Sequence, residues 1–178
     1  FFRTALGATD KNVGGAFDPV TEADKAAEAA VRRLIGAQFP NHGVVGEEFG
    51  TQGASAEYVW TLDPIDGTRA FLCGLPLWGT LIGLGKSGAP VYGMMSQPFT
   101  RERFFGDGAR AGWRGPGREG RLVERRLAAR PCAALGEATL MTTSPHLFSG
   151  ETEAAFARVA QECRLSRYGG DCYAYCML

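Results

Sequence analysis

The chain has 178 residues, a formal net charge of zero and 45% hydrophobic residues, so we expect residues 1–178 to form a single globular domain with its own core. It contains no apolar run of about 18 residues, which argues against a membrane-spanning helix and a membrane partner. Its five cysteines include no C-x-x-C pair, which favours reduced thiols and a cytoplasmic location.

Both ends of the sequence resemble interior segments of a longer fold. The chain opens on Phe1 without a methionine, and residues 1–17 are expected to end a helix and enter a loop through Gly14-Gly15. Residues 173–178 form an apolar run without a capping or breaking residue. We therefore expect a chain that is truncated at both ends.

Charge is unevenly distributed along the chain. Residues 1–66 hold ten acidic and five basic side chains, whereas residues 101–130 hold nine arginines and four acids. An arginine-rich stretch can bind nucleic acid. This one is interrupted by glycine and proline, so we expect a solvated hairpin and loop, and no nucleic-acid partner. The acidic first third of the chain favours metal binding.

The first third also carries clear signals for local structure. Thr21 is expected to cap a helix, with Asp24 at the third helical position closing the capping arrangement. Apolar residues at helical spacing extend this helix to about Gln38. A short strand at Val44-Val45 follows, and residues 49–57 are expected to form a flexible loop that can close over a site.

The remaining elements alternate between strand and helix patterns. A short helix should follow residue 68 and end near Gly74, and three strands then form an antiparallel meander. The expected elements are strands at 78–86, 91–97 and 103–106, a hairpin within 113–130, a strand at 138–143, a helix at 151–162, a strand at 165–168 and a helix that opens at residues 169–171. Hairpins with helices at both ends indicate an α+β layered domain.

The central motif is the segment Asp63-Pro64-Ile65-Asp66-Gly67-Thr68, which follows a short buried strand at 58–62. Two carboxylates three residues apart repel each other unless a cation lies between them. Mg²⁺ takes oxygen ligands, and the carbonyl of Ile65 could be a third. The amides of Gly67 and Thr68 would open a helix, where a phosphate is stabilised. The alternative is an ordinary turn, in which both acids bond to local backbone.

Two upstream acidic segments favour the metal site. Together with Gly46-Glu47-Glu48 and the segment from Asp18 to Asp24, the central motif resembles the inositol monophosphatase family of magnesium-dependent phosphatases. The resemblance implies a layered α/β/α/β/α sandwich, a homodimer, a small-molecule phosphate monoester as substrate and two to three Mg²⁺ ions as cofactors. It also implies a further metal-binding aspartate that lies beyond the end of this sequence.

The resemblance also assigns roles to individual residues. One Mg²⁺ would be held by Glu47, Asp63 and the Ile65 carbonyl, a second by Asp63 and Asp66, and a weaker third by Glu47 and Asp24. The catalytic residues would be Glu48 and Thr68, which together orient the attacking water. The amides of Gly67 and Thr68 would hold the phosphate. Asp24 could equally serve the helix N-terminus alone.

The last glycines bear on the substrate. Gly169, Gly170 and Asp171 match the substrate-contact segment of the family, and Asp171 places a carboxylate where the alcohol part of a substrate would lie. A carboxylate near a phosphate favours a substrate that carries a cation. This resembles the histidinol-phosphatase branch, which converts L-histidinol phosphate to L-histidinol in histidine biosynthesis. The alternatives are inositol 1-phosphate as substrate, a catalytically impaired chain that binds metal and phosphate, and a role for Asp171 as a helix cap only.

Overall fold

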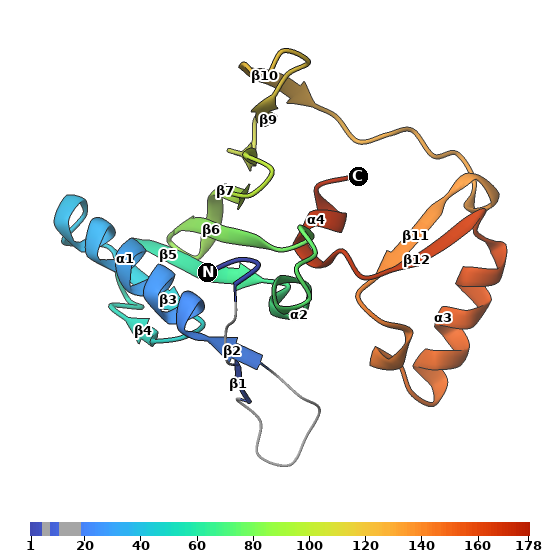
Figure 1. Ribbon diagram of the computed structural model, residues 1–178, viewed down its shortest axis with the longest axis horizontal. Coiled ribbons are helices and arrows are strands. Elements are labelled where there is room, and N and C mark those ends of the chain that lie inside the picture. Colours follow the sequence, from blue (N-terminus) through green and yellow to red (C-terminus); the bar gives the residue numbers. More distant parts are fainter. Residues whose placement is uncertain (5–7, 11–18) are drawn as a thin grey trace.

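The protein combines one large sheet with two small sheets and four α-helices within the part of the chain that the structure describes (Figure 1). This structure is a computed structural model, and it describes residues 1–4, 8–10 and 19–178. Asp18 and Gly14-Gly15, which were singled out in the sequence, lie outside the described residues. The mixed architecture confirms the predicted α+β class.

The large sheet has eight strands in the order β10-β9-β8-β7-β6-β5-β3-β4. Its strands are β3 (Gly43–Gly46), β4 (Gly50–Gln52), β5 (Tyr58–Asp66), β6 (Gly79–Lys86), β7 (Ala89–Gln97), β8 (Glu102–Gly106), β9 (Ala111–Pro116) and β10 (Leu122–Leu127). Neighbouring strands are antiparallel except β3 and β5, which are parallel. The predicted meander and the predicted hairpin are therefore confirmed as consecutive strands of one sheet.

Helix α1 (Glu22–Gln38) lies across the β3 and β5 end of this sheet (Figure 1). Thr21 is its N-cap, and Asp24 completes a capping box, as the sequence predicted. The apolar side of the helix packs on the sheet where Ile35 contacts Val44 and Leu62, all three of them buried. The apolar residues at helical spacing in the sequence therefore form the face of α1 that packs on the sheet.

Strand β5 runs four residues further than the sequence suggested. Asp63-Pro64 was expected to end the strand, but β5 continues to Asp66 across a register shift against β6. Proline has no N–H to donate to the ladder, and a bulge is one of the few places where a sheet accepts it. Helix α2 (Thr68–Leu72) follows at once, as predicted, with Gly67 as its N-cap.

The C-terminal part forms a smaller unit beside the large sheet (Figure 1). Parallel strands β11 (Thr139–Thr142) and β12 (Leu165–Tyr168) are joined by α3 (Glu151–Glu162), with short 3-10 helices at Leu135–Glu137 and Pro145–Leu147. Helix α4 (Asp171–Tyr175) then returns to the large sheet, where Cys172 packs with Met95 and Phe104. These elements agree with the sequence predictions for residues 138–171.

Two predictions for local structure were wrong. Residues 1–17 were expected to end a helix, but residues 1–4 form a turn, and β1 (Ala8–Asp10) pairs antiparallel with β2 (Pro19–Thr21). Residues 49–57 were expected to form a loop throughout, but residues 50–52 form the edge strand β4 beside β3. Three exposed residues leave no apolar alternation in the sequence to reveal such a strand.

No helix in the described ranges is long and apolar enough to span a bilayer.

We expect Phe71→Ala to lower the free energy of unfolding by about 3–5 kcal/mol, as for other buried phenylalanines. Phe71 belongs to α2, is 4% exposed, and packs in one buried cluster with Ala23, Ile65 and Trp78. Urea denaturation measures the change. The matched control is Phe49→Ala, because Phe49 is 53% exposed and its loss should change stability by only about 0.5 kcal/mol. Equal effects of the two substitutions would contradict this assignment of the core.

Candidate active site

A cavity of about 480 Å³ lies where the end of β5, the start of α2 and the start of α4 meet. Nine of the eleven site residues proposed from the sequence line it, although they are scattered over more than 120 positions. They are Glu47, Asp63, Ile65, Asp66, Gly67, Thr68, Gly169, Gly170 and Asp171. Asp24 and Glu48 are described by the structure but do not line this cavity.

The bulge in β5 explains why two carboxylates three residues apart reach one cavity. Side chains alternate between the faces of a strand, so residues three apart normally point to opposite sides. Here Asp63 pairs with Leu81 and Asp66 with Gly79, so two residues of β5 stand opposite one residue of β6. The hydroxyl of that residue, Thr80, donates a hydrogen bond to the Pro64 carbonyl at 2.8 Å and fixes the bulge.

Asp63 occupies the most strained electrostatic position in the cavity. Burial raises the pKa of Asp63 to about 8, with repulsion from Glu47 and then Asp66 adding to the rise. The N–H of Ile65 donates to the carboxylate and acts in the opposite direction. One oxygen, Oδ1, is buried without a hydrogen-bond partner among the described residues. A hydrogen bond with the Glu47 side chain also raises the pKa of Asp63. Buried polar atoms usually have a hydrogen-bond partner, so Oδ1 needs one that the described residues do not supply.

A divalent cation fits this donor set. It would remove the repulsion between Asp63, Glu47 and Asp66 and would give Oδ1 its missing partner, and carboxylate and carbonyl oxygens are the ligands that Mg²⁺ prefers. Within the described ranges, no three His, Cys, Asp or Glu side chains already converge as a ready-made metal site. Glu47, Asp63 and Asp66 therefore line one cavity without already converging on one point, and the proposed set adds a main-chain oxygen, that of Ile65.

Hydrogen bonds hold the residues on either side of the bulge. The Thr68 hydroxyl donates to the Ile65 carbonyl at 3.1 Å, and the N–H of Cys172 donates to Asp66 Oδ2 at 2.6 Å. Gly67 has φ 84°, a left-handed conformation that favours glycine, and this conformation starts α2 directly after the strand. The first N–H groups of a helix have no intrahelical acceptor, so those of α2 are available to an anion.

Asp171 lies against this helix start. Its Oδ2 would be 2.9 Å from a Cβ placed on Gly67, so the carboxylate occupies the space beside that glycine. Burial raises the pKa of Asp171, a hydrogen bond from Thr143 lowers it, repulsion from Asp66 raises it, and attraction to Arg69 lowers it. The N-cap of α4 is Gly170, and no side chain of the described residues caps this helix. Asp171 is therefore the first residue of α4 and not its N-cap, and its contact with a substrate stays a prediction.

The two proposed residues outside the cavity have other contacts. Asp24 is 3% exposed, and its Oδ2 accepts the N–H of Thr21 at 2.8 Å and the Thr21 hydroxyl at 2.5 Å. The N–H of Glu48 donates to Glu28 at 2.7 Å. An outer metal contact for Asp24 and a pairing of Glu48 with Thr68 stay predictions.

Several residues of the site were missed in the sequence. Arg69 and Thr143 line the cavity and act on the pKa of Asp171. Arg69 directly follows the central motif, so its place at the start of α2 was a usable signal. Thr143 directly follows β11, and only the folded chain brings it to the cavity. Glu28 does not line the cavity but supports the segment that carries Glu47.

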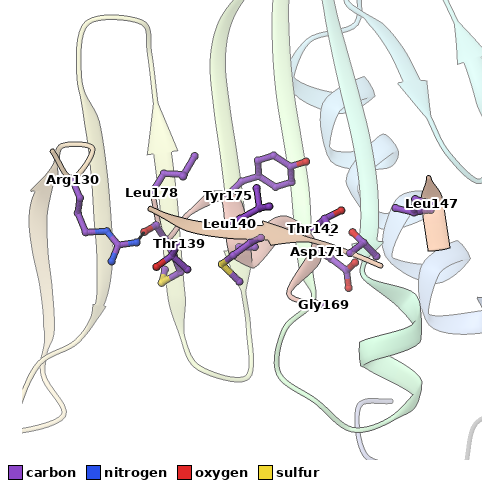
Figure 2. Close-up of a pocket in the computed structure, with 13 residues that line it drawn as sticks. Arg130, Thr139, Leu140, Thr142, Leu147, Gly169, Asp171, Tyr175 and Leu178 are labelled. Carbon is purple, nitrogen blue, oxygen red and sulfur yellow. Dashed lines mark hydrogen bonds between the residues drawn. The ribbon is translucent and has the colours of Figure 1, made fainter. Parts of the chain in front are cut away.

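A second cavity of about 330 Å³ adjoins the first and shares Thr143, Gly169 and Asp171 with it. Figure 2 shows Arg130 at one end of this second cavity and Leu147 at the other, with Asp171 between them on the side of Leu147. The intervening wall is largely apolar and includes Leu140, Met141 and Tyr175. Asp171 therefore lies between the cavity that holds Glu47, Asp63 and Asp66 and a second cavity with fewer charged residues.

The raised pKa of Asp63 predicts how the metal-free protein responds to pH. A carboxyl whose folded pKa lies above its unfolded value of 3.8 stabilises the fold at low pH, and this contribution is lost as pH rises to about 8. In chelator at pH 8.5, Asp63→Asn should therefore be more stable than the parent protein by at least about 1.4 kcal/mol, the equivalent of one pKa unit. Urea denaturation at pH 5 and 8.5 measures this difference.

Exposed Glu119 offers a control on the β9–β10 loop, and Glu119→Gln should show no such pH-dependent gain. Added Mg²⁺ should stabilise the parent protein at pH 8.5 and leave Asp63→Asn nearly unchanged. An Asp63→Asn protein that is less stable than its parent in chelator at pH 8.5 would contradict the electrostatic description of the site.

Comparison with known proteins agrees with the fold. The profile of the inositol monophosphatase family matches residues 2–178. The chain is 42% identical to the chloroplastic bifunctional phosphatase IMPL2 of Arabidopsis thaliana, over 100% of this chain and 49% of the relative. It is 41% identical to a histidinol-phosphatase of Mycobacterium tuberculosis, over 58% of this chain and 40% of the relative.

Solved structures give the same result. An inositol monophosphatase from Zymomonas mobilis superposes with a TM-score of 0.80 at 38% identity, covering 99% of this chain and 64% of that one. The chain spans about half the length of IMPL2 and less of the M. tuberculosis enzyme. These matches, together with the acidic cavity at the end of β5, show that the chain belongs to the inositol monophosphatase family of phosphatases.

Proposed function

We propose that the protein carrying this chain is a Mg²⁺-dependent phosphatase that converts L-histidinol phosphate to L-histidinol in histidine biosynthesis. The observation that carries the proposal is the unpartnered Oδ1 of Asp63, buried beside Glu47 and Asp66 and next to the start of α2. This arrangement provides a place for a cation and, adjacent to it, a place for an anion. A phosphate monoester bound through metal needs both.

Different acidic residues would bind different metal ions. Glu47, Asp63 and the Ile65 carbonyl would hold one ion, Asp63 and Asp66 would share a second, and Glu47 with Asp24 would hold a weaker third. When bound, these two to three ions would neutralise the phosphate charge and lower the pKa of a bound water. The register shift in β5 keeps Asp63 and Asp66 on the same cavity, so one segment can serve two ions.

The other residues act on the phosphate and the water. The N–H groups of Gly67 and Thr68, at the start of α2, would donate to phosphate oxygens and fix the ester in place. Glu48 and the Thr68 hydroxyl would take and orient a proton of the attacking water. In the structure that hydroxyl donates to the Ile65 carbonyl. The Ile65 carbonyl has two lone pairs, so it could hold a metal and still accept this hydroxyl, whose own oxygen could then accept a proton of the water. No covalent intermediate with the protein is required.

Asp171 supports the choice of histidinol phosphate. Its carboxylate lies beside Gly67, close to the proposed phosphate position, and Asp66 repels it. A substrate that brings an ammonium group would relieve this repulsion, whereas a neutral polyol would not. Gly169 and Gly170 flank the cavity with no side chain to obstruct the alcohol part of the substrate. A related histidinol-phosphatase shares 41% identity with part of this chain.

Inositol 1-phosphate is the second candidate substrate. Arg69 attracts Asp171 and lowers its pKa, so the chain already supplies a cation that can satisfy this carboxylate. The resemblance to an inositol monophosphatase of known structure points the same way. A third possibility is a chain that binds metal and phosphate without turnover. We further propose a homodimer and a cytoplasmic location, as expected from the sequence.

Phosphate release by the complete protein, with and without Mg²⁺, tests the proposal on L-histidinol phosphate and inositol 1-phosphate. We expect faster turnover of histidinol phosphate and no turnover in chelator. Asp171→Asn should lower kcat/KM for histidinol phosphate by about 10- to 100-fold, because a charge-assisted hydrogen bond contributes roughly 1.5–3 kcal/mol. The same variant should leave inositol phosphate hydrolysis, if measurable, within a few-fold.

Arg69→Gln separates the two uses of Asp171. If Asp171 meets the substrate cation, removing Arg69 should not abolish the preference for histidinol phosphate. A preference for inositol 1-phosphate, or an unchanged Asp171→Asn enzyme, would reject the histidinol assignment. Mg²⁺ binding without phosphate release from either ester would favour the non-catalytic alternative.

A further inference from the structure

We propose that Glu28 on α1 is a positioning residue that holds Glu47 in place for metal binding. This inference rests on the proposed function, because it assigns Glu47 a metal. Glu28 is one turn of helix beyond Asp24, and its side chain is completely buried, at 0% exposure. A buried carboxylate this far from solvent is retained only with several hydrogen bonds.

Those hydrogen bonds connect Glu28 to residues 46–50, the segment that carries Glu47. Oε2 of Glu28 accepts the N–H of Glu48 at 2.7 Å, and Oε1 accepts the N–H of Phe49 at 3.2 Å. Arg32, one turn further along α1, donates from Nε to Oε1 at 2.7 Å. The two N–H groups directly after Glu47 are thus bonded to one carboxylate on α1.

Arg32 extends the attachment to the far end of the segment. Its Nη2 donates to the Gly50 carbonyl, while Nε remains on Glu28. On the other side, the N–H of Glu47 donates to the Leu62 carbonyl at 3.2 Å, the residue before Asp63. Glu47 therefore lies between an attachment to β5 and an attachment to α1. Its side chain is directed by backbone fixed on both sides.

Gly46 shows how closely this segment packs on Glu28. A Cβ on Gly46 would lie 1.9 Å from Glu28 Oε1 and 2.4 Å from its carboxyl carbon. Both are far shorter than any tolerated contact, so a side chain at position 46 would displace the Glu28 carboxylate, the segment, or both. The glycine before the glutamate pair is explained by this contact rather than by a special backbone angle.

A plain structural role for Glu28 would change stability alone, whereas a positioning role changes the metal requirement. Outer residues that orient metal ligands typically alter metal affinity by 10- to 100-fold. Gln in place of Glu28 keeps the shape, but it turns one acceptor into a donor that faces the N–H of Glu48 or of Phe49. The segment carrying Glu47 should then shift while α1 stays folded.

The test is a Mg²⁺ titration of the complete protein, followed by hydrolysis of p-nitrophenyl phosphate and by calorimetry without substrate. Glu28→Gln should raise the Mg²⁺ concentration for half-maximal activity at least about tenfold, while kcat at saturating Mg²⁺ stays within about threefold. Glu22→Gln is the matched control, because Glu22 is exposed on the same helix and should leave the titration unchanged. Melting in chelator reports on the fold of each variant.

Gly46→Ala tests the same contact from the other side and should also raise the Mg²⁺ requirement, with Glu28 intact. An unchanged Mg²⁺ requirement in a folded Glu28→Gln protein would overturn the proposal. Loss of folding in both variants would assign Glu28 a purely structural role and would overturn it as well. If the parent protein binds Mg²⁺ but hydrolyses no ester, the proposed function fails, and the calorimetric titrations alone decide the role of Glu28.

Discussion

Repulsion between carboxylates that share a poorly hydrated space is the constraint on which this structure depends. The fold holds three carboxylates together, those of Asp63 and Asp66 at the end of β5 and that of Glu47 in the segment after β3. It does so although Glu47 and Asp66 both raise the pKa of Asp63. Nothing in the packing of an apolar core requires this. A site that is unfavourable in the empty protein and favourable with a cation is the usual mark of function in a buried acidic group.

The rest of the fold supplies rigidity around that unfavourable group. Beneath the site, Ile65 and Phe71 are buried with Trp78, so the bulge and the start of α2 rest on packed side chains. On one side α1 presents Glu28 to the segment of Glu47, and on the other α4 donates an N–H to Asp66. Two residues more than a hundred positions apart, Glu28 and Cys172, therefore hold the backbone beside Glu47 and the carboxylate of Asp66 at one site.

Sequence patterns predicted most elements because periodicity and capping are local signals. The helix from residue 22 to 38 and the strands from residue 79 onward follow from apolar spacing and turn residues. The extension of β5 to Asp66 was missed, because Asp-Pro is usually a turn and only pairing with β6 reveals the bulge. Glu28 was missed because a glutamate among alanines reads as a solvated position, and its acceptor role depends on backbone twenty residues away.

The register shift at Pro64 has a consequence for how this chain can vary. The shift adds one residue to β5 relative to β6, and that added residue decides which side of the sheet Asp66 faces. Removing or inserting a single residue here would send a carboxylate to the opposite surface, whatever amino acids remained. Substitution of the apolar residues in this segment should therefore be tolerated far better than the insertion or deletion of a residue. The spacing between Asp63 and Asp66 matters more than the identity of the residues between them.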